Sequence, residues 1–163
     1  MYTEKNFKTK KALKEAVAAF NAYTPRTPQP FAKALYEREE MFKDSYGEDH
    51  DCTVIALSVA AGIPYNVAHD ILSAAGRDRR KGFGLCGWLR CQYRDGRSVC
   101  GYKVTPVNAG WKTLAQVRRD FPKGRFILRK RGHVFAMIDN EVMDYGTGNR
   151  TRITDLFLFE RGM

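Results

Sequence analysis

The sequence lacks any apolar run that approaches the roughly 18 residues of a membrane-spanning helix. Its first residues, MYTEKNFKTKK, lack the apolar core of a secretory signal peptide. It also contains no internal repeat and no low-complexity tract. Together these absences predict a globular protein that stays in the cytoplasm and has no membrane partner.

Cysteine and histidine are scarce, with four and three residues respectively. In a reducing compartment the cysteines are expected to be thiols rather than a disulfide framework. Cys86, Cys91 and Cys100 lie close together in the sequence, but a zinc site needs a fourth ligand and usually has tighter, paired spacings. We expect ordinary thiols there, no metal and no cofactor, with a zinc site built from these cysteines and a histidine as the weaker alternative.

Acidic residues are in the minority, at 18 against 28 basic ones, for a net charge of +10. Residues 31–51 are nevertheless acidic, with a net charge of −4 (3 basic, 7 acidic), whereas residues 77–103 (8 basic, 2 acidic) and 118–131 (7 basic, 1 acidic) each carry +6. Two basic blocks either bind an anionic partner, such as nucleic acid or an acidic protein, or form a solvated basic surface. The candidate anion- or partner-binding residues are Arg79, Arg80, Lys81, Arg129, Lys130 and Arg131.

The length of 163 residues, with 44% hydrophobic and 28% charged residues, predicts a single domain. Hydrophobic periodicity predicts helices over residues 8–22, 31–43, 52–61, 65–76, 85–93 and 111–121. It predicts strands over residues 102–107, 125–130, 133–138, 141–146 and 152–160. Helices followed by an antiparallel sheet indicate an α+β fold, with residues 1–45 as an N-terminal helical extension and residues 46–163 as the core.

The helix predicted over residues 52–61 begins with a cysteine. Asp51 is expected to cap this helix with its side chain, and Gly62 is expected to end it. The unpaired N–H groups and the macrodipole at a helix start favour negative charge, which lowers the pKa of a thiol. Cys52 is therefore a candidate nucleophile.

Asp139 and Asn140 are a typical two-residue turn pair, and they fix the register of the hairpin that they join. In that register Ile138 faces Glu141, and His133 and Asp144 become diagonal neighbours on one face. A slip of one residue would separate them onto opposite faces.

This geometry predicts a catalytic triad. Cys52 would attack a carbonyl carbon, His133 would hold the thiolate and protonate the leaving group, and Asp144 would orient the imidazole. The oxyanion candidates are the helix-start N–H groups at Asp51 and Cys52, together with the His50 side chain.

Each of these residues also has an ordinary structural interpretation. Buried cysteines are common, so Cys52 would then fill the core. Asp144 would be a strand-end residue, and His69 would be a packing or surface histidine of its helix. The catalytic hypothesis depends on the three residues occurring together.

Two stretches, DCTVIALSVAAGIPYNVAHDILSAAGR and WKTLAQVRRDFPKGRFILRKRGHVFAMIDNEVMDYG, resemble small papain-like proteins of tailed bacteriophages. Those proteins typically have an Asn-Asp-Cys helix start, a Gly-x-Pro-Tyr turn and a Gly-His-Val strand. The resemblance covers residues 45–146, apart from an insertion over Cys86–Cys100, and it extends to the papain, C39 and transglutaminase-like group. It implies a papain-like fold with Cys52 as nucleophile, His133 as base and Asp144 as orienting acid. In this sequence His50 replaces the usual Asn, and the loop before Cys52 has no amide side chain.

The resemblance implies a cysteine hydrolase (peptidase, isopeptidase or amidase) that acts on a host or viral protein in the host cytoplasm. The alternative is an inactive papain-like binding protein, which would engage nucleic acid or inhibit a host protein through its basic surface. Residues 1–45 would either cover the cleft or extend the core.

Overall fold

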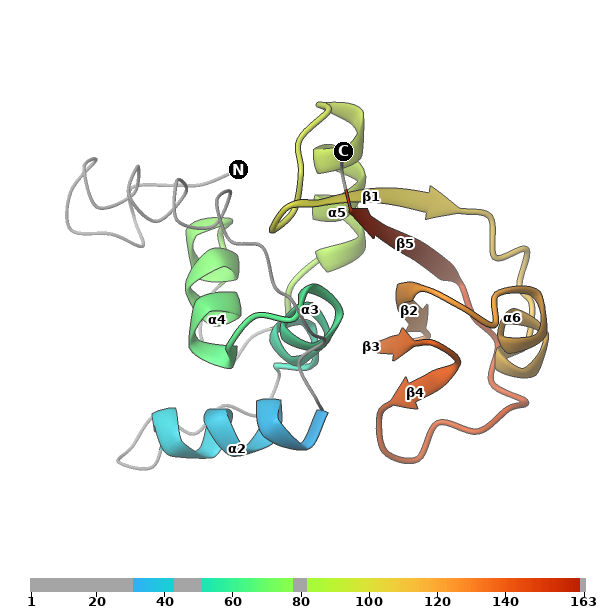
Figure 1. The fold of residues 1–163 in the computed structure, drawn as a ribbon, viewed down its shortest axis with the longest axis horizontal. Helices are drawn as coiled ribbons and strands as arrows, with labels where there is room; N and C mark the ends of the chain where they lie inside the picture. Colours follow the sequence, from blue (N-terminus) through green and yellow to red (C-terminus); the bar gives the residue numbers. More distant parts are fainter. Residues whose placement is uncertain (1–30, 43–50, 78–81, 162–163) are drawn as a thin grey trace.

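The computed structural model describes residues 31–42, 51–77 and 82–161 (Figure 1). Its helices are α2 (Phe31–Phe42), α3 (Cys52–Ala61), α4 (Tyr65–Ala74), α5 (Leu85–Arg94) and α6 (Leu114–Asp120). Its strands are β1 (Tyr102–Val107), β2 (Arg125–Lys130), β3 (His133–Ile138), β4 (Glu141–Met143) and β5 (Asp155–Arg161). The α+β class is confirmed, while the predicted helix over residues 8–22 falls outside the described residues.

The strands form one antiparallel sheet in the order β1-β5-β2-β3-β4. The hairpin of β3 and β4 has the predicted register, in which Ile138 pairs with Glu141 and Met137 with Val142. Asp139 and Asn140 adopt φ angles of 48° and 71°. A two-residue turn with both angles positive matches the twist of the flanking strands, so it holds this register.

Side chains alternate between the two faces of the sheet, and each face is covered by helices. On one face, Ile127, Ala136 and Phe157 join a core formed with α3, α4 and α5. On the other face, Phe126 and Met137 pack with Leu114 and Val117 of α6. Figure 1 shows β2, β3 and β4 between α3 and α6.

Helix α3 is the central helix of this core. Every residue from Val54 to Ala61 except Ile55 is buried, because the helix contacts α2, α4, β2 and β3. Gly62 ends it with a left-handed φ of 68°, and its N–H donates to Ser58 and Val59 carbonyls. That conformation favours glycine, as the sequence predicted.

The prediction that the Asp51 side chain caps α3 is wrong. Asp51 occupies the N-cap position, but its side chain makes no capping hydrogen bond. Its φ and ψ of −112° and 21° lie outside the extended region that a capping side chain normally requires.

Some element boundaries also differ from those predicted. Helix α6 begins at Leu114 rather than Trp111, because Thr113 and Gln116 form a reciprocal capping box. Strand β4 ends at Met143 rather than at residue 146, and β5 begins at Asp155 rather than at residue 152.

Within the described ranges, no single helix is long and apolar enough to cross a membrane. Helices α3 and α4 meet that criterion only as a pair, which is bent by 118°.

Candidate active site

Cys52 is the first residue of α3, and its side chain is only partly buried. The first backbone hydrogen bond of the helix runs from the Ile55 N–H to the Asp51 carbonyl, at 3.0 Å. The N–H groups of Cys52 and Thr53 therefore lie in the first turn, where a helix has no carbonyl partner for them. Two further groups reach the sulfur from β3, namely the His133 side chain and the Val134 backbone N–H.

His133, the first residue of β3, lies between the sulfur and a carboxylate. Its Nε2 atom is 3.0 Å from Oδ1 of Asp144, which follows β4 directly. The other carboxylate oxygen of Asp144 accepts a hydrogen bond from the Thr147 hydroxyl, and that hydroxyl oxygen accepts one from Lys130 Nζ at 3.1 Å. Since Nε2 faces Asp144, Nδ1 is the ring nitrogen left for the thiol.

Two pKa shifts of opposite direction follow from this contact. Burial raises the pKa of the Cys52 thiol, but the hydrogen bonds from His133 and Val134 and the charge of His133 outweigh it, so the pKa lies below its ordinary value. The hydrogen bond with Cys52 raises the pKa of His133, burial lowers it, and Asp144 raises it further, so the pKa lies above its ordinary value. Both shifts favour a thiolate paired with an imidazolium.

The carboxylate of Asp51 has a structural role beside the site. Its side chain is only 5% exposed, and it accepts hydrogen bonds from the Tyr65 hydroxyl at 2.7 Å and from Arg38 at 3.3 Å. The Tyr65 N–H in turn donates to Glu37 at 2.8 Å. Because Arg38 and Glu37 belong to α2, this network fixes α2 and α4 around the start of α3.

A cleft of about 640 Å³ opens beside the sulfur. Its polar lining includes Arg38, Asp51, His133 and Asp144. The apolar lining consists of Phe31, Leu35, Ile55, Val134, Phe135, Met143 and Tyr145. The rings of Phe31 and Tyr145, both in this lining, pack edge to face with their centroids 4.8 Å apart. A volume of this size accommodates a short peptide segment or a comparable acyl group.

The structure brings Cys52, His133 and Asp144 together, and Asp51 lines the same cleft beside them. Of the oxyanion candidates, Cys52 contributes its first-turn N–H, Asp51 precedes the helix, and His50 lies outside the described residues. His69 packs its ring against Tyr65 at 6.1 Å between centroids. Sequence reasoning missed Arg38 and Tyr65, because no local pattern links them to Asp51.

Of the candidate partner-binding residues that the structure describes, none lines the cleft. Arg129 pairs with Asp155 at 3.3 Å, Lys130 binds Thr147, and Arg131 is exposed in the turn before β3. Arg79, Arg80 and Lys81 lie outside the described residues.

The other cysteines are also free thiols. Cys86 and Cys100 are buried, and Cys91 lies 3.5 Å from an Arg94 nitrogen. Burial, followed by the charge of Asp155, raises the pKa of Cys86 to about 11, and burial raises the pKa of Cys100 well above its ordinary value. No three His, Cys, Asp or Glu side chains of the described residues are arranged to hold a metal ion.

No family model, curated protein or solved structure matches the chain.

Proposed function

We propose that the protein is a papain-like cysteine hydrolase that cleaves an amide, isopeptide or thioester bond in a host or viral protein. The observation that carries the proposal is the contact of Cys52, at the start of α3, with a His133 ring that Asp144 holds at 3.0 Å. An activated thiolate, a base and a group that orients the base are the three parts of nucleophilic acyl transfer.

The chemistry divides into two steps. The Cys52 thiolate attacks the carbonyl carbon, a sulfur–carbon bond forms, and His133 gives its proton to the leaving group as the original bond breaks. Water then gives a proton to His133 as it attacks the thioester carbon, the sulfur–carbon bond breaks, and the carboxylic acid leaves while the Cys52 thiolate and the His133 imidazolium are restored. The first-turn N–H groups of α3 donate to the oxyanion in both steps.

The papain-like part of the proposal is supported by the placement of the three residues. The nucleophile starts a buried central helix, while the base and the orienting acid come from adjacent strands of an antiparallel sheet. The resemblance of residues 45–146 to small phage papain-like proteins agrees with this placement, and it favours action in a host cytoplasm.

The test uses p-nitrophenyl acetate, an activated ester that does not require the natural substrate. The expected result is a burst of p-nitrophenolate with one acetyl group on Cys52, located by mass spectrometry of the whole and digested protein. Cys52→Ala should abolish the burst while its thermal unfolding stays cooperative, and Cys91→Ala is the matched control that keeps it. An equal burst from Cys52→Ala would contradict the proposal.

The net charge of +10 favours a second candidate, an inactive binding protein for nucleic acid or an acidic host protein. That protein would bind heparin or DNA with an affinity that falls steeply with salt and is the same in Cys52→Ala. Retention without any acetylation of Cys52 would favour this candidate over the hydrolase.

A further inference from the structure

Trp111 is an exposed tryptophan in the turn that leads from β1 to α6. It is 67% exposed, and its ring packs in neither hydrophobic core. The Lys112 N–H closes this turn by donating to the Ala109 carbonyl at 2.9 Å. Trp88, the other tryptophan of the chain, is 5% exposed within α5. Trp111 is therefore the tryptophan that presents its large apolar ring to solvent.

The backbone of the turn holds Trp111 in a strained conformation. Gly110 and Trp111 have φ angles of 54° and 58°, and two positive angles at the central positions define a type I′ turn. Glycine, asparagine and aspartate dominate these positions, because a bulky side chain is strained there. The ring lies in solvent, so core packing does not offset this strain. Because backbone strain is concentrated at functional sites, the turn is a candidate binding site.

The segment between β4 and β5 lies directly beside this turn. The Leu114 N–H, at the start of α6, donates to the Thr151 carbonyl at 2.8 Å. Nη1 of Arg152 donates to the Trp111 carbonyl at 3.0 Å. Figure 1 shows the connection from β1 to α6 and the connection from β4 to β5 meeting at α6. The guanidinium group of Arg152 is therefore a neighbour of the strained turn.

The two segments that meet at α6 are basic. Residues 108–120 and 147–154 carry a net charge of +4 (5 basic, 1 acidic). The acidic residue, Asp120, pairs with Lys112 at 2.9 Å and with Arg119 at 3.4 Å. Arg150 and Arg152 are exposed, and neither pairs with a carboxylate in the part of the chain that the structure describes. Their charges are therefore open to an anionic ligand.

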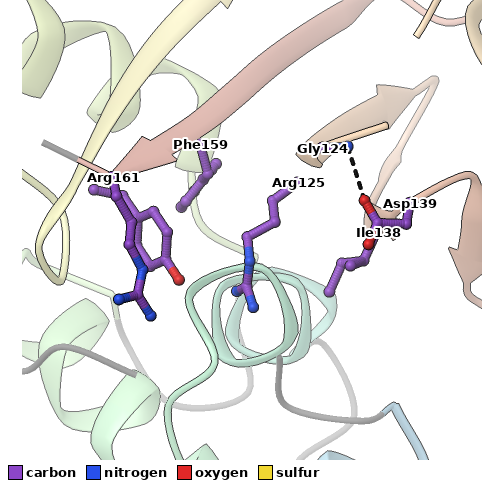
Figure 2. A pocket seen from close by; sticks show the side chains of 7 residues that line it. Gly124, Arg125, Ile138, Asp139, Phe159 and Arg161 are labelled. Atoms are coloured by element: carbon purple, nitrogen blue, oxygen red, sulfur yellow. Dashed lines mark hydrogen bonds between the residues drawn. The ribbon is translucent and has the colours of Figure 1, made fainter. Parts of the chain in front are cut away.

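Arg118 adds a third positive charge, and its partners are neutral. Its Nε and Nη1 atoms donate to the side-chain oxygens of Asn140 at 3.0 Å and Asn149 at 3.2 Å. Asp139, which precedes Asn140, is engaged elsewhere, since its Oδ1 accepts a hydrogen bond from the Gly124 N–H at 3.0 Å (Figure 2). Arg118 thus supports both connections without losing its charge to an ion pair.

We propose that this surface binds single-stranded nucleic acid, with a base stacked on Trp111 and phosphates bound by Arg150 and Arg152. An exposed aromatic ring beside cationic side chains is the combination that binds single strands with little sequence preference. A membrane fits less well, because Trp111 is the single large apolar side chain exposed in residues 108–120 and 147–154. None of these residues lines the catalytic cleft, so the binding is independent of catalysis by Cys52.

The experiment titrates the full chain with an oligothymidylate of about 12 nucleotides and with an abasic strand of the same length. The oligothymidylate should quench tryptophan fluorescence and bind about tenfold more tightly than the abasic strand, because only its bases can stack. Equal affinities would attribute the binding to phosphate charge and overturn the proposal. Polyglutamate that binds as tightly as the oligothymidylate would identify an acidic protein as the partner and would also overturn it.

Trp111→Gly separates stacking from a structural role. Glycine adopts a positive φ freely, so this variant should not unfold at a lower temperature than the wild type. It should bind the oligothymidylate about tenfold more weakly and lose the quenching, because the remaining Trp88 is buried. Tyr93→Ala, at an exposed aromatic residue of α5, is the matched control and should keep the affinity. A lower unfolding temperature with unchanged affinity would overturn the assignment.

Arg150→Gln tests the phosphate contact. It should lower the slope of log affinity against log salt concentration by about 0.7, as expected for one contact with a single strand. Lys103→Gln removes an exposed charge near the start of β1, at the other end of that strand from Trp111, and should leave the affinity unchanged. Equal weakening by both variants would overturn the proposal. Vesicles of phosphatidylserine that shift Trp111 fluorescence where the oligothymidylate does not would also overturn it.

Discussion

The Nε2 atom of His133 lies 3.0 Å from Oδ1 of Asp144, so the imidazole presents its Nδ1 edge to Cys52. Both residues belong to one hairpin, and their spacing follows from the pairing of Met137 with Val142. The orientation of the proposed base is therefore set by the register of a two-residue turn.

The four thiols should react with iodoacetamide at different rates. Cys52 should react fastest near neutral pH because its pKa is lowered, while Cys86 and Cys100 should react slowest because burial raises theirs. Mass spectrometry of digests taken over time measures each rate. His133→Gln should slow Cys52 alone, and four equal rates would count against an activated thiolate.

Asp144→Ala should lower kcat/KM for an ester or amide substrate by about 100-fold, because the imidazole loses the group that fixes its orientation. Asp144→Asn keeps an acceptor oxygen for Nε2 and should lose less. Thr147→Val removes only the support of the Asp144 carboxylate and should have the smallest effect. A kcat/KM that is the same in all three variants would show that Asp144 does not position His133.

The activity should depend on pH through both shifted groups. Raising the pH generates the thiolate at a pKa below the ordinary value of about 8.5, and it removes the imidazolium only at a pKa above the ordinary value of about 6.5. We expect a bell-shaped profile of kcat/KM whose two limbs belong to the coupled pair. Cys52 alkylation in His133→Gln should move to higher pH, whereas Cys91→Ala should keep the wild-type profile.

Asp51→Asn should separate stability from thiol activation. The charge of Asp51 raises the pKa of Cys52, so its removal should shift alkylation of Cys52 to lower pH. The variant should also lose about 1–3 kcal/mol of stability, since the buried carboxylate binds Tyr65 and Arg38. Tyr65→Phe, measured by the same denaturation and alkylation experiments, should lose similar stability without the shift to lower pH.

Local patterns in the sequence predicted the parts of the site that depend on neighbouring residues. The Asp139-Asn140 turn fixed the pairing of β3 with β4, and Gly62 marked the end of α3. The capping box of Thr113 and Gln116 was also visible as a Thr-x-x-Gln pattern, and it would have placed the start of α6 correctly.

Contacts between distant segments left no such pattern. Arg38 and Tyr65 lie 13 and 14 residues from Asp51, and Arg125 lies 65 residues from Ala60. These pairs meet only because α2, α4 and β2 pack around α3, so the sequence assigned Asp51 to a local cap instead. A carboxylate at a helix start has several candidate donors, and tertiary packing selects among them.

The burial of α3 on nearly every side has a consequence for the motions of the site. Helix α3 is packed against four elements, so it cannot shift without disturbing the close-packed core. The sulfur of Cys52, the first residue of this helix, is therefore held in place. His133 and Asp144 lie instead on the β3–β4 hairpin at the edge of the sheet, and the edge strand β4 is three residues long. In the proposed hydrolase, small adjustments of the site would therefore occur in the β3–β4 hairpin, and the substrate would be positioned against a stationary Cys52.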